Sequence, residues 1–141
     1  MSAQENARIA KVSYEAFNAR DFDRAAALVS KDSEWLNVPL GMTLHGQEGY
    51  RQVVQGWATA FPDSRIEIGS MIASEEGVVT EFRGRGTHTG PLASPAGEIP
   101  ATGRSVDIPF CDVLRIKDGK IISAHTYYDA ATMMRQLGLI S

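Results

Sequence analysis

Apolar residues recur every three or four positions through the first 61 residues, which is the spacing of one helix face. The pattern predicts helices over residues 5–19, from Asp21 or Asp23 to 29, and over 47–61. Pro62 ends the last of these, because the residue before a proline disfavours helical geometry. A short strand is predicted at 34–38.

The pattern changes after residue 64, where the segments between turn residues are typical of strands. Four strands joined mostly by tight turns are predicted at 65–73, 78–88, 105–117 and 120–128. A terminal helix, 130–137, is stopped by Gly138. The Gly- and Pro-rich segment 90–103 exceeds an ordinary hairpin connection, which predicts a mobile flap at the mouth of a pocket.

Helices followed by an antiparallel meander indicate an α+β fold. We expect the helices to pack on one face of a strongly curved antiparallel sheet, which closes as a cone with an open mouth. The length of 141 residues suits a single domain spanning 1–141. We also expect a homodimer through the outer sheet face, because Ile66, Ile68 and Ile72 are more apolar than a solvated face should be.

Composition and charge argue against several kinds of partner and site. A net charge of −3 with scattered Lys and Arg argues against nucleic acid as a partner. The chain has no apolar run of membrane-spanning length and no signal-like N-terminus, so we expect a cytoplasmic protein without a membrane partner. The single cysteine, Cys111, leaves no internal disulfide and no CxxC motif.

Several short motifs occur in a characteristic order, at 61–63, 86–90, 100–104, 112–121, 128–129 and 135–138. Together they resemble the SnoaL-like polyketide cyclases, of the nuclear transport factor 2-like and ketosteroid isomerase-like superfamily. The resemblance implies a cone-shaped fold and intramolecular aldol ring closure of a polyketide ester without metal or cofactor. It also implies that Asp129 is the acid/base aspartate, whereas His125 stands where the family often has Trp.

Asp129 lies in phase with His125 and Tyr127 on the last strand, so a regular strand would gather an acid, an imidazole and a phenol on one face. A poorly solvated carboxylate in an apolar cone has a raised pKa and is a better base near neutral pH. The alternative is that Asp129 caps the helix beginning at Ala130.

Asp112 and His88 are the other candidate catalytic residues. Asp112 lies in phase with Phe110 on an otherwise apolar strand face, and the alternative is that it lies at an exposed strand end or pairs with Arg83 or Arg85. His88 precedes the Gly-rich loop, at the expected mouth, and could equally be a structural or exposed loop histidine.

A cone that encloses a pocket must line it with some of its large side chains. We expect the lining to include Trp35, Met42, Phe110, Tyr127 and Trp57, which could otherwise be ordinary core residues. No metal site is predicted, because the three histidines form no HxH or HxxxH pair.

The sequence therefore predicts a cofactor-independent enzyme that abstracts an α-proton from a small apolar carbonyl compound. Tyr127, His125 or His88 would donate a hydrogen bond to the enolate oxygen. Two alternatives use the same pocket: a non-catalytic domain that binds a small apolar molecule, and an isomerase, dehydratase or epoxide hydrolase.

Overall fold

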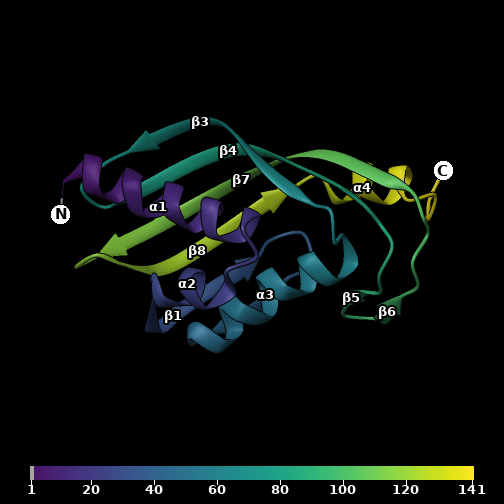
Figure 1. Cartoon of the computed structure of the whole chain (residues 1–141), viewed down its shortest axis with the longest axis horizontal. Helices are drawn as coiled ribbons and strands as arrows, with labels where there is room; N and C mark the ends of the chain where they lie inside the picture. The colour runs from purple at the N-terminus through teal and green to yellow at the C-terminus, as the bar shows by residue number, and fades with distance from the viewer. Residues whose placement is uncertain (1) are drawn as a thin grey trace.

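Four helices and eight strands follow one another in residues 2–141, the part of the chain that this computed structural model describes (Figure 1). The helices are α1 (Ala3–Asn18), α2 (Phe22–Ala27), α3 (Gly46–Ala60) and α4 (Ala130–Gln136). The strands are β1 (Val29–Asn37), β2 (Met42–His45), β3 (Arg65–Ala73), β4 (Gly77–Thr87), β5 (Leu92–Ser94), β6 (Gly97–Ile99), β7 (Ser105–Lys117) and β8 (Lys120–Tyr128). None of the helices in this part of the chain is both long and apolar enough to cross a membrane.

The main sheet has six strands in the order β2-β1-β8-β7-β4-β3. The predicted antiparallel meander of four strands is present as β3, β4, β7 and β8. The sheet as a whole is mixed and not purely antiparallel, because β1 pairs with β8 in parallel. The first half of β1 is polar, shows no alternation and pairs irregularly with β8 between Val29 and Glu34. The predicted strand therefore covered only the second half of β1.

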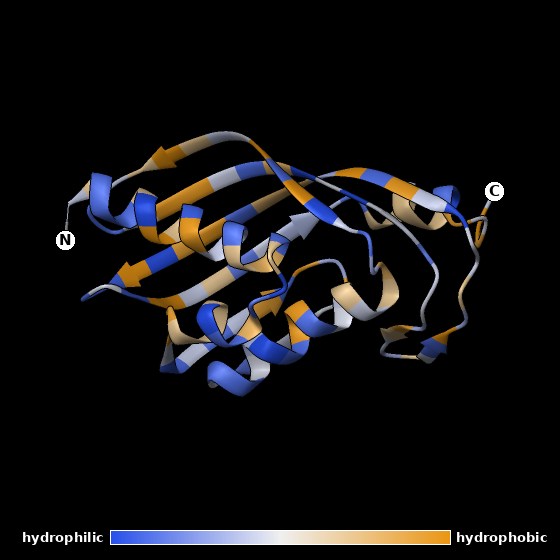
Figure 2. Cartoon of the chain, in the orientation of Figure 1, coloured by the Kyte–Doolittle hydropathy of each residue, from blue (hydrophilic) through white to orange (hydrophobic). Residues whose placement is uncertain are grey.

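Helices α1 and α3 lie on the concave face of the curved sheet (Figure 1). Alternate residues of the strands are apolar, as the banding along β4 and β7 shows, and those apolar residues meet the helices (Figure 2). Ile9, Tyr14 and Phe17 of α1 are buried against this face together with Phe82 and Leu114. The predicted α+β architecture of helices on a curved sheet is confirmed.

The segment between β4 and β7 contains a small hairpin, with β5 paired to β6, and is not wholly irregular as predicted. The turn between them needs Gly97, whose φ of +115° is rarely adopted by residues with a side chain. The hairpin packs beside α3 beyond the end of the main sheet (Figure 1). Its movement as a flap stays a prediction.

Only part of the apolar surface predicted for a dimer interface, namely Ile66, Ile68 and Ile72, lies on the outer face of the sheet. A bulge between Ile68 and Ser70 changes which residues of β3 face outward. As a result Ile66 lines the interior, whereas Ile72 is 73% exposed. The register places Ile72 beside Val79, which lies next to Val113 and then His125. These four residues form one row across the outer face, called here the outer row.

Candidate functional site

An apolar cavity lies between the concave face of the sheet and helices α1 and α3, and is called here the inner cavity. Its wall is rich in aromatic side chains, which include Tyr14, Trp35, Tyr50, Trp57, Phe82 and Phe110. The rings pack against one another, with Phe82 stacked on Phe110 at a centroid separation of 5.1 Å. Such a wall excludes water from whatever polar groups face the cavity.

Polar side chains meet in one row of the inner sheet face. The strand register places Thr80 of β4 beside Asp112 of β7, Asp112 beside Thr126 of β8, and Thr126 beside Asn37 of β1. Three of these residues, Asn37, Asp112 and Thr126, line the inner cavity. The row therefore places a carboxylate within a largely apolar wall.

Asp112 is the central residue of this site, and its side chain is only 3% exposed. Its Oδ2 accepts a hydrogen bond from the Tyr14 hydroxyl at 2.8 Å, and its Oδ1 accepts one from Thr126 Oγ1 at 2.7 Å. Burial raises the pKa of Asp112 to about 6, although both hydrogen bonds act to lower it. Asp112 therefore titrates close to the pH range in which an acid/base group is most effective.

The two tyrosines beside Asp112 are held in the phenol form. Burial, and then the nearby charge of Asp112, raise the pKa values of Tyr14 and Tyr50 above the ordinary tyrosine range. Tyr14 uses its hydroxyl to hold Asp112, whereas Tyr50 makes no side-chain hydrogen bond within residues 2–141. Tyr50, which lines the inner cavity, therefore has an O–H donor that no described residue uses.

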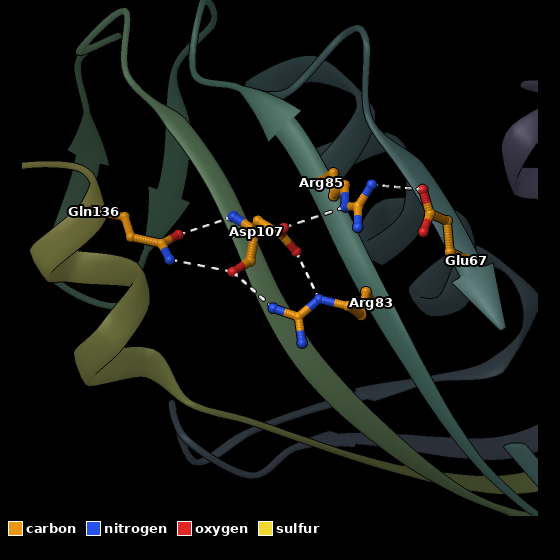
Figure 3. A network of polar contacts seen from close by, with 5 residues as sticks. All are labelled: Glu67, Arg83, Arg85, Asp107 and Gln136. Carbon is orange, nitrogen blue, oxygen red and sulfur yellow. Dashed lines mark hydrogen bonds and ion pairs between the residues drawn. The ribbon is translucent and has the colours of Figure 1, made fainter. Parts of the chain in front are cut away.

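The predicted alternative for Asp112, an ion pair with Arg83 or Arg85, is wrong. Both arginines lie on the other face of the sheet and pair with Asp107, at 2.8 and 3.2 Å, while Arg85 also reaches Glu67 (Figure 3). Side chains alternate along a strand, so odd-numbered residues of β4 point away from Asp112. Asp112 has no cationic partner in the described part of the chain.

Asp129 is not in the cavity. It is exposed at the start of α4, where its Oδ1 accepts a hydrogen bond from the Thr132 backbone N–H and its Oδ2 accepts one from the Thr132 hydroxyl. These bonds hold the pKa of the Asp129 carboxyl below its ordinary value, mainly through the hydroxyl. Its observed position is that of the N-cap, which was the alternative interpretation.

The prediction that the odd-numbered residues of β8 face the cavity is wrong, and a bulge in the strand explains why. The register with β7 shifts near Ile122, so Ile121 is buried but Ser123 and later odd-numbered residues point outward. His125 belongs to the outer row, and Tyr127 is 43% exposed. Thr126, which the alternation argument placed on the wrong face, is the residue of β8 that contacts Asp112.

His88 is buried behind the wall of the inner cavity and does not lie at its mouth. Its Nδ1 accepts a hydrogen bond from the Thr102 backbone N–H at 3.2 Å, and the ring lies 5.3 Å from Phe61, centroid to centroid. Burial lowers the pKa of His88, which favours the neutral imidazole. His88 therefore anchors the segment that follows β4. This structural role is the predicted alternative to catalysis.

The predicted lining residues divide into three groups. Trp35, Trp57 and Phe110 line the inner cavity as expected, and Met42 lines a second, adjacent cavity. Tyr127 lines neither. Tyr14 and Tyr50 were missed as site residues, because their helical spacing is that of ordinary core positions. No group of three or more potential metal ligands occurs in residues 2–141.

Solved structures share this fold over almost the whole chain. A proposed SnoaL-like polyketide cyclase from Jannaschia sp. CCS1 has a TM-score of 0.86 at 17% identity, covering 99% of this chain and 95% of that one. AclR of Streptomyces galilaeus, a proposed hydroxylase, has a TM-score of 0.83 at 21% identity, covering 99% and 89%. IdmH of Streptomyces antibioticus, a proposed polyketide cyclase, has a TM-score of 0.76 at 28% identity, covering 94% and 98%.

Sequence comparison leads to the same group. No match was found among curated protein sequences. The family model of the SnoaL-like polyketide cyclase matches residues 7–137, from within α1 to the end of α4. The chain therefore belongs to the SnoaL-like polyketide cyclase family.

Proposed function

We propose that this protein catalyses proton transfer on a small apolar carbonyl compound, with Asp112 as the group that takes and returns the proton. The observation that carries this proposal is a buried carboxylate without a cationic partner in the wall of an aromatic cavity. The proposal moves the acid/base role from Asp129, which caps α4, to Asp112.

The arrangement around Asp112 supports enolate formation. Tyr14 and Thr126 fix the carboxylate from two sides, and each oxygen keeps a lone pair for the substrate. Asp112 would accept the α-proton while the C–H electron pair forms the C=C bond of the enolate and the C=O π pair moves onto the carbonyl oxygen. The hydroxyl of Tyr50, a residue that lines the same cavity, would donate a hydrogen bond to that oxygen, and a donor in an apolar cavity stabilises a developing enolate strongly.

An intramolecular aldol closure completes the sequence. The enolate carbon attacks a second carbonyl carbon of the same molecule, and a carbon–carbon bond forms while that carbonyl becomes an alkoxide. The proton held on Asp112 is then transferred to the alkoxide oxygen, which restores the carboxylate. Every proton and electron pair in this scheme comes from the substrate or from Asp112.

The pH dependence of proton exchange tests this proposal. We expect the protein to accelerate deuterium exchange at the α-carbon of an aryl β-keto ester in D2O, followed by NMR. Because the pKa of Asp112 is about 6 and the base is the carboxylate, the catalysed rate should fall about tenfold per pH unit below about 6 and level off above it. A catalysed rate that stays constant down to pH 4 would exclude Asp112 as the base.

A non-catalytic binding domain is the second candidate. It is favoured by one observation, namely that both oxygens of Asp112 already accept hydrogen bonds from the protein, as those of a structural carboxylate would. The exchange experiment separates the two functions. A binding domain would bind the β-keto ester without raising its exchange rate above that of buffer.

The outer row supports our proposal of a homodimer. Ile72, Val79 and Val113 place apolar side chains side by side on an open sheet face, and a two-fold axis through that face would cover them in both copies. Light scattering at micromolar concentration should give twice the chain mass of 15.3 kDa. Ile72→Glu should shift the protein toward the single-chain mass, and a wild-type monomer would contradict the proposal.

A further inference from the structure

A second cavity adjoins the inner cavity and is called here the methionine cavity. It lies among the edge strand β2, helices α3 and α4, and the β5–β6 hairpin, whose place beside α3 is visible in Figure 1. Its wall includes Met42, Met133, Met134, Leu92 and Ile99. Met side chains are flexible and polarisable, so such a wall can adapt to apolar ligands of different shape.

The two cavities share a wall formed by Trp35, Asn37, Val53 and Trp57. They differ in chemistry, because Asp112, Tyr14 and Tyr50 all belong to the inner cavity. The hydroxyl of Tyr128 is the only ionisable group among the residues that line the methionine cavity. The reacting end of a ligand would therefore lie in the inner cavity, and an apolar extension would lie in the methionine cavity.

Gly56 supplies an independent observation. It lies in the interior of α3, where glycine is an unfavourable helix residue, and it lines the methionine cavity. A Cβ built on Gly56 would meet no other atom within 4 Å. No close packing therefore requires glycine here, and its effect is to leave space in the methionine cavity.

We propose that the methionine cavity binds the apolar arm of an elongated carbonyl substrate whose reacting end lies at Asp112. The substrate class is thus a carbonyl compound extended by an apolar, alkyl-like chain that carries no charge. The assignment of the reacting end rests on the proposed function. Burial of each methylene of the arm should tighten binding by about fourfold.

A homologous series of 4-alkylphenols, from methyl to octyl, tests the proposal. The phenol imitates an enol beside Asp112, and binding can be followed by fluorescence, because both tryptophans of the chain, Trp35 and Trp57, lie in the shared wall. The measured quantity is the ratio of the hexyl to the methyl affinity. In Gly56→Phe this ratio should fall by about sixteenfold or more, the value of two methylenes.

Matched variants make the result specific. Gln55→Phe adds the same ring at the neighbouring exposed position of α3 and should keep the wild-type ratio. Gly56→Ala and Gly56→Leu add smaller groups and should lower the hexyl-to-methyl ratio by smaller, graded factors. Because Ala is a better helix former than Gly, the series does not depend on the folding of the Phe variant. An unchanged ratio in the Leu or Phe variant, or an equal loss in Gln55→Phe, would overturn the proposal.

The same series separates this inference from the proposed function. Asp112→Asn should change the affinities of the methyl and hexyl members by the same factor and so keep their ratio. If Asp112→Asn retains proton exchange while the ratio still depends on Gly56, the proposed function fails and the arm-binding cavity stands. If exchange is lost in Asp112→Asn but the ratio does not depend on Gly56, the proposed function stands and the inference fails.

Discussion

Replacing Asp112 by Asn should lower the rate of catalysed α-proton exchange by about 10²–10⁴-fold, the usual contribution of a positioned general base. Asn has nearly the shape of Asp and can still accept a hydrogen bond from Tyr14 or Thr126, but it cannot take up a proton. The rate should be measured by NMR with the same aryl β-keto ester, at pH 8, where the wild-type carboxylate is ionised.

Asp129→Asn is the matched control. Asn is as good an N-cap as Asp, so this variant should fold normally and keep its exchange activity. The reverse result, with exchange lost in Asp129→Asn and kept in Asp112→Asn, would restore the assignment that the family resemblance implied. Equal retention in both variants would place the base elsewhere.

The pH dependence of the free energy of unfolding gives a second measurement on Asp112→Asn. The folded-state pKa of Asp112, about 6, lies above its ordinary value of 3.8, so the folded protein binds the extra proton more tightly than the unfolded chain. This group's contribution to the free energy of unfolding therefore decreases as pH rises from about 4 to about 6. Asn does not titrate, and the variant should lack this part of the pH dependence in urea unfolding.

Phe61→Ala should lower the free energy of unfolding by about 3–5 kcal/mol, as is typical when a buried aromatic ring is removed. The ring is 1% exposed, stacks on Trp57 at a centroid distance of 5.6 Å and packs beside His88. It also belongs to a second core cluster with Ile108 and Leu137, so its removal leaves a void that rigid neighbours cannot fill. Urea unfolding at neutral pH measures the effect.

Ile140→Ala is the control for this prediction, because Ile140 is also apolar but 49% exposed near the C-terminus. Its free energy of unfolding should stay within about 0.5 kcal/mol of wild type. A loss below about 1 kcal/mol for Phe61→Ala would mean that the neighbouring side chains close the void, which would contradict the rigid packing inferred here.

Local periodicity determined most of the secondary structure. The predicted strands 65–73, 105–117 and 120–128 have the same bounds as β3, β7 and β8, because regular alternation with clear turns marks a strand at both ends. The bounds of the helices were predicted to within a few residues, because apolar residues recur at helical spacing within each of them. The family resemblance was also available from short motifs, and the match over residues 7–137 confirms it.

Tertiary structure decided the site. The bulge near Ile122 inserts one residue into β8, and because side chains alternate with a period of two, one extra residue exchanges the inner and outer faces. The pairing of Asp112 with Tyr14 joins residues 98 positions apart, which no local pattern encodes. By itself the sequence could therefore supply two candidate aspartates and the elements that carry them. Only the packing of α1 on the concave face of the sheet, with Tyr14 bonded to Asp112, buried one of them, and the other became a helix cap.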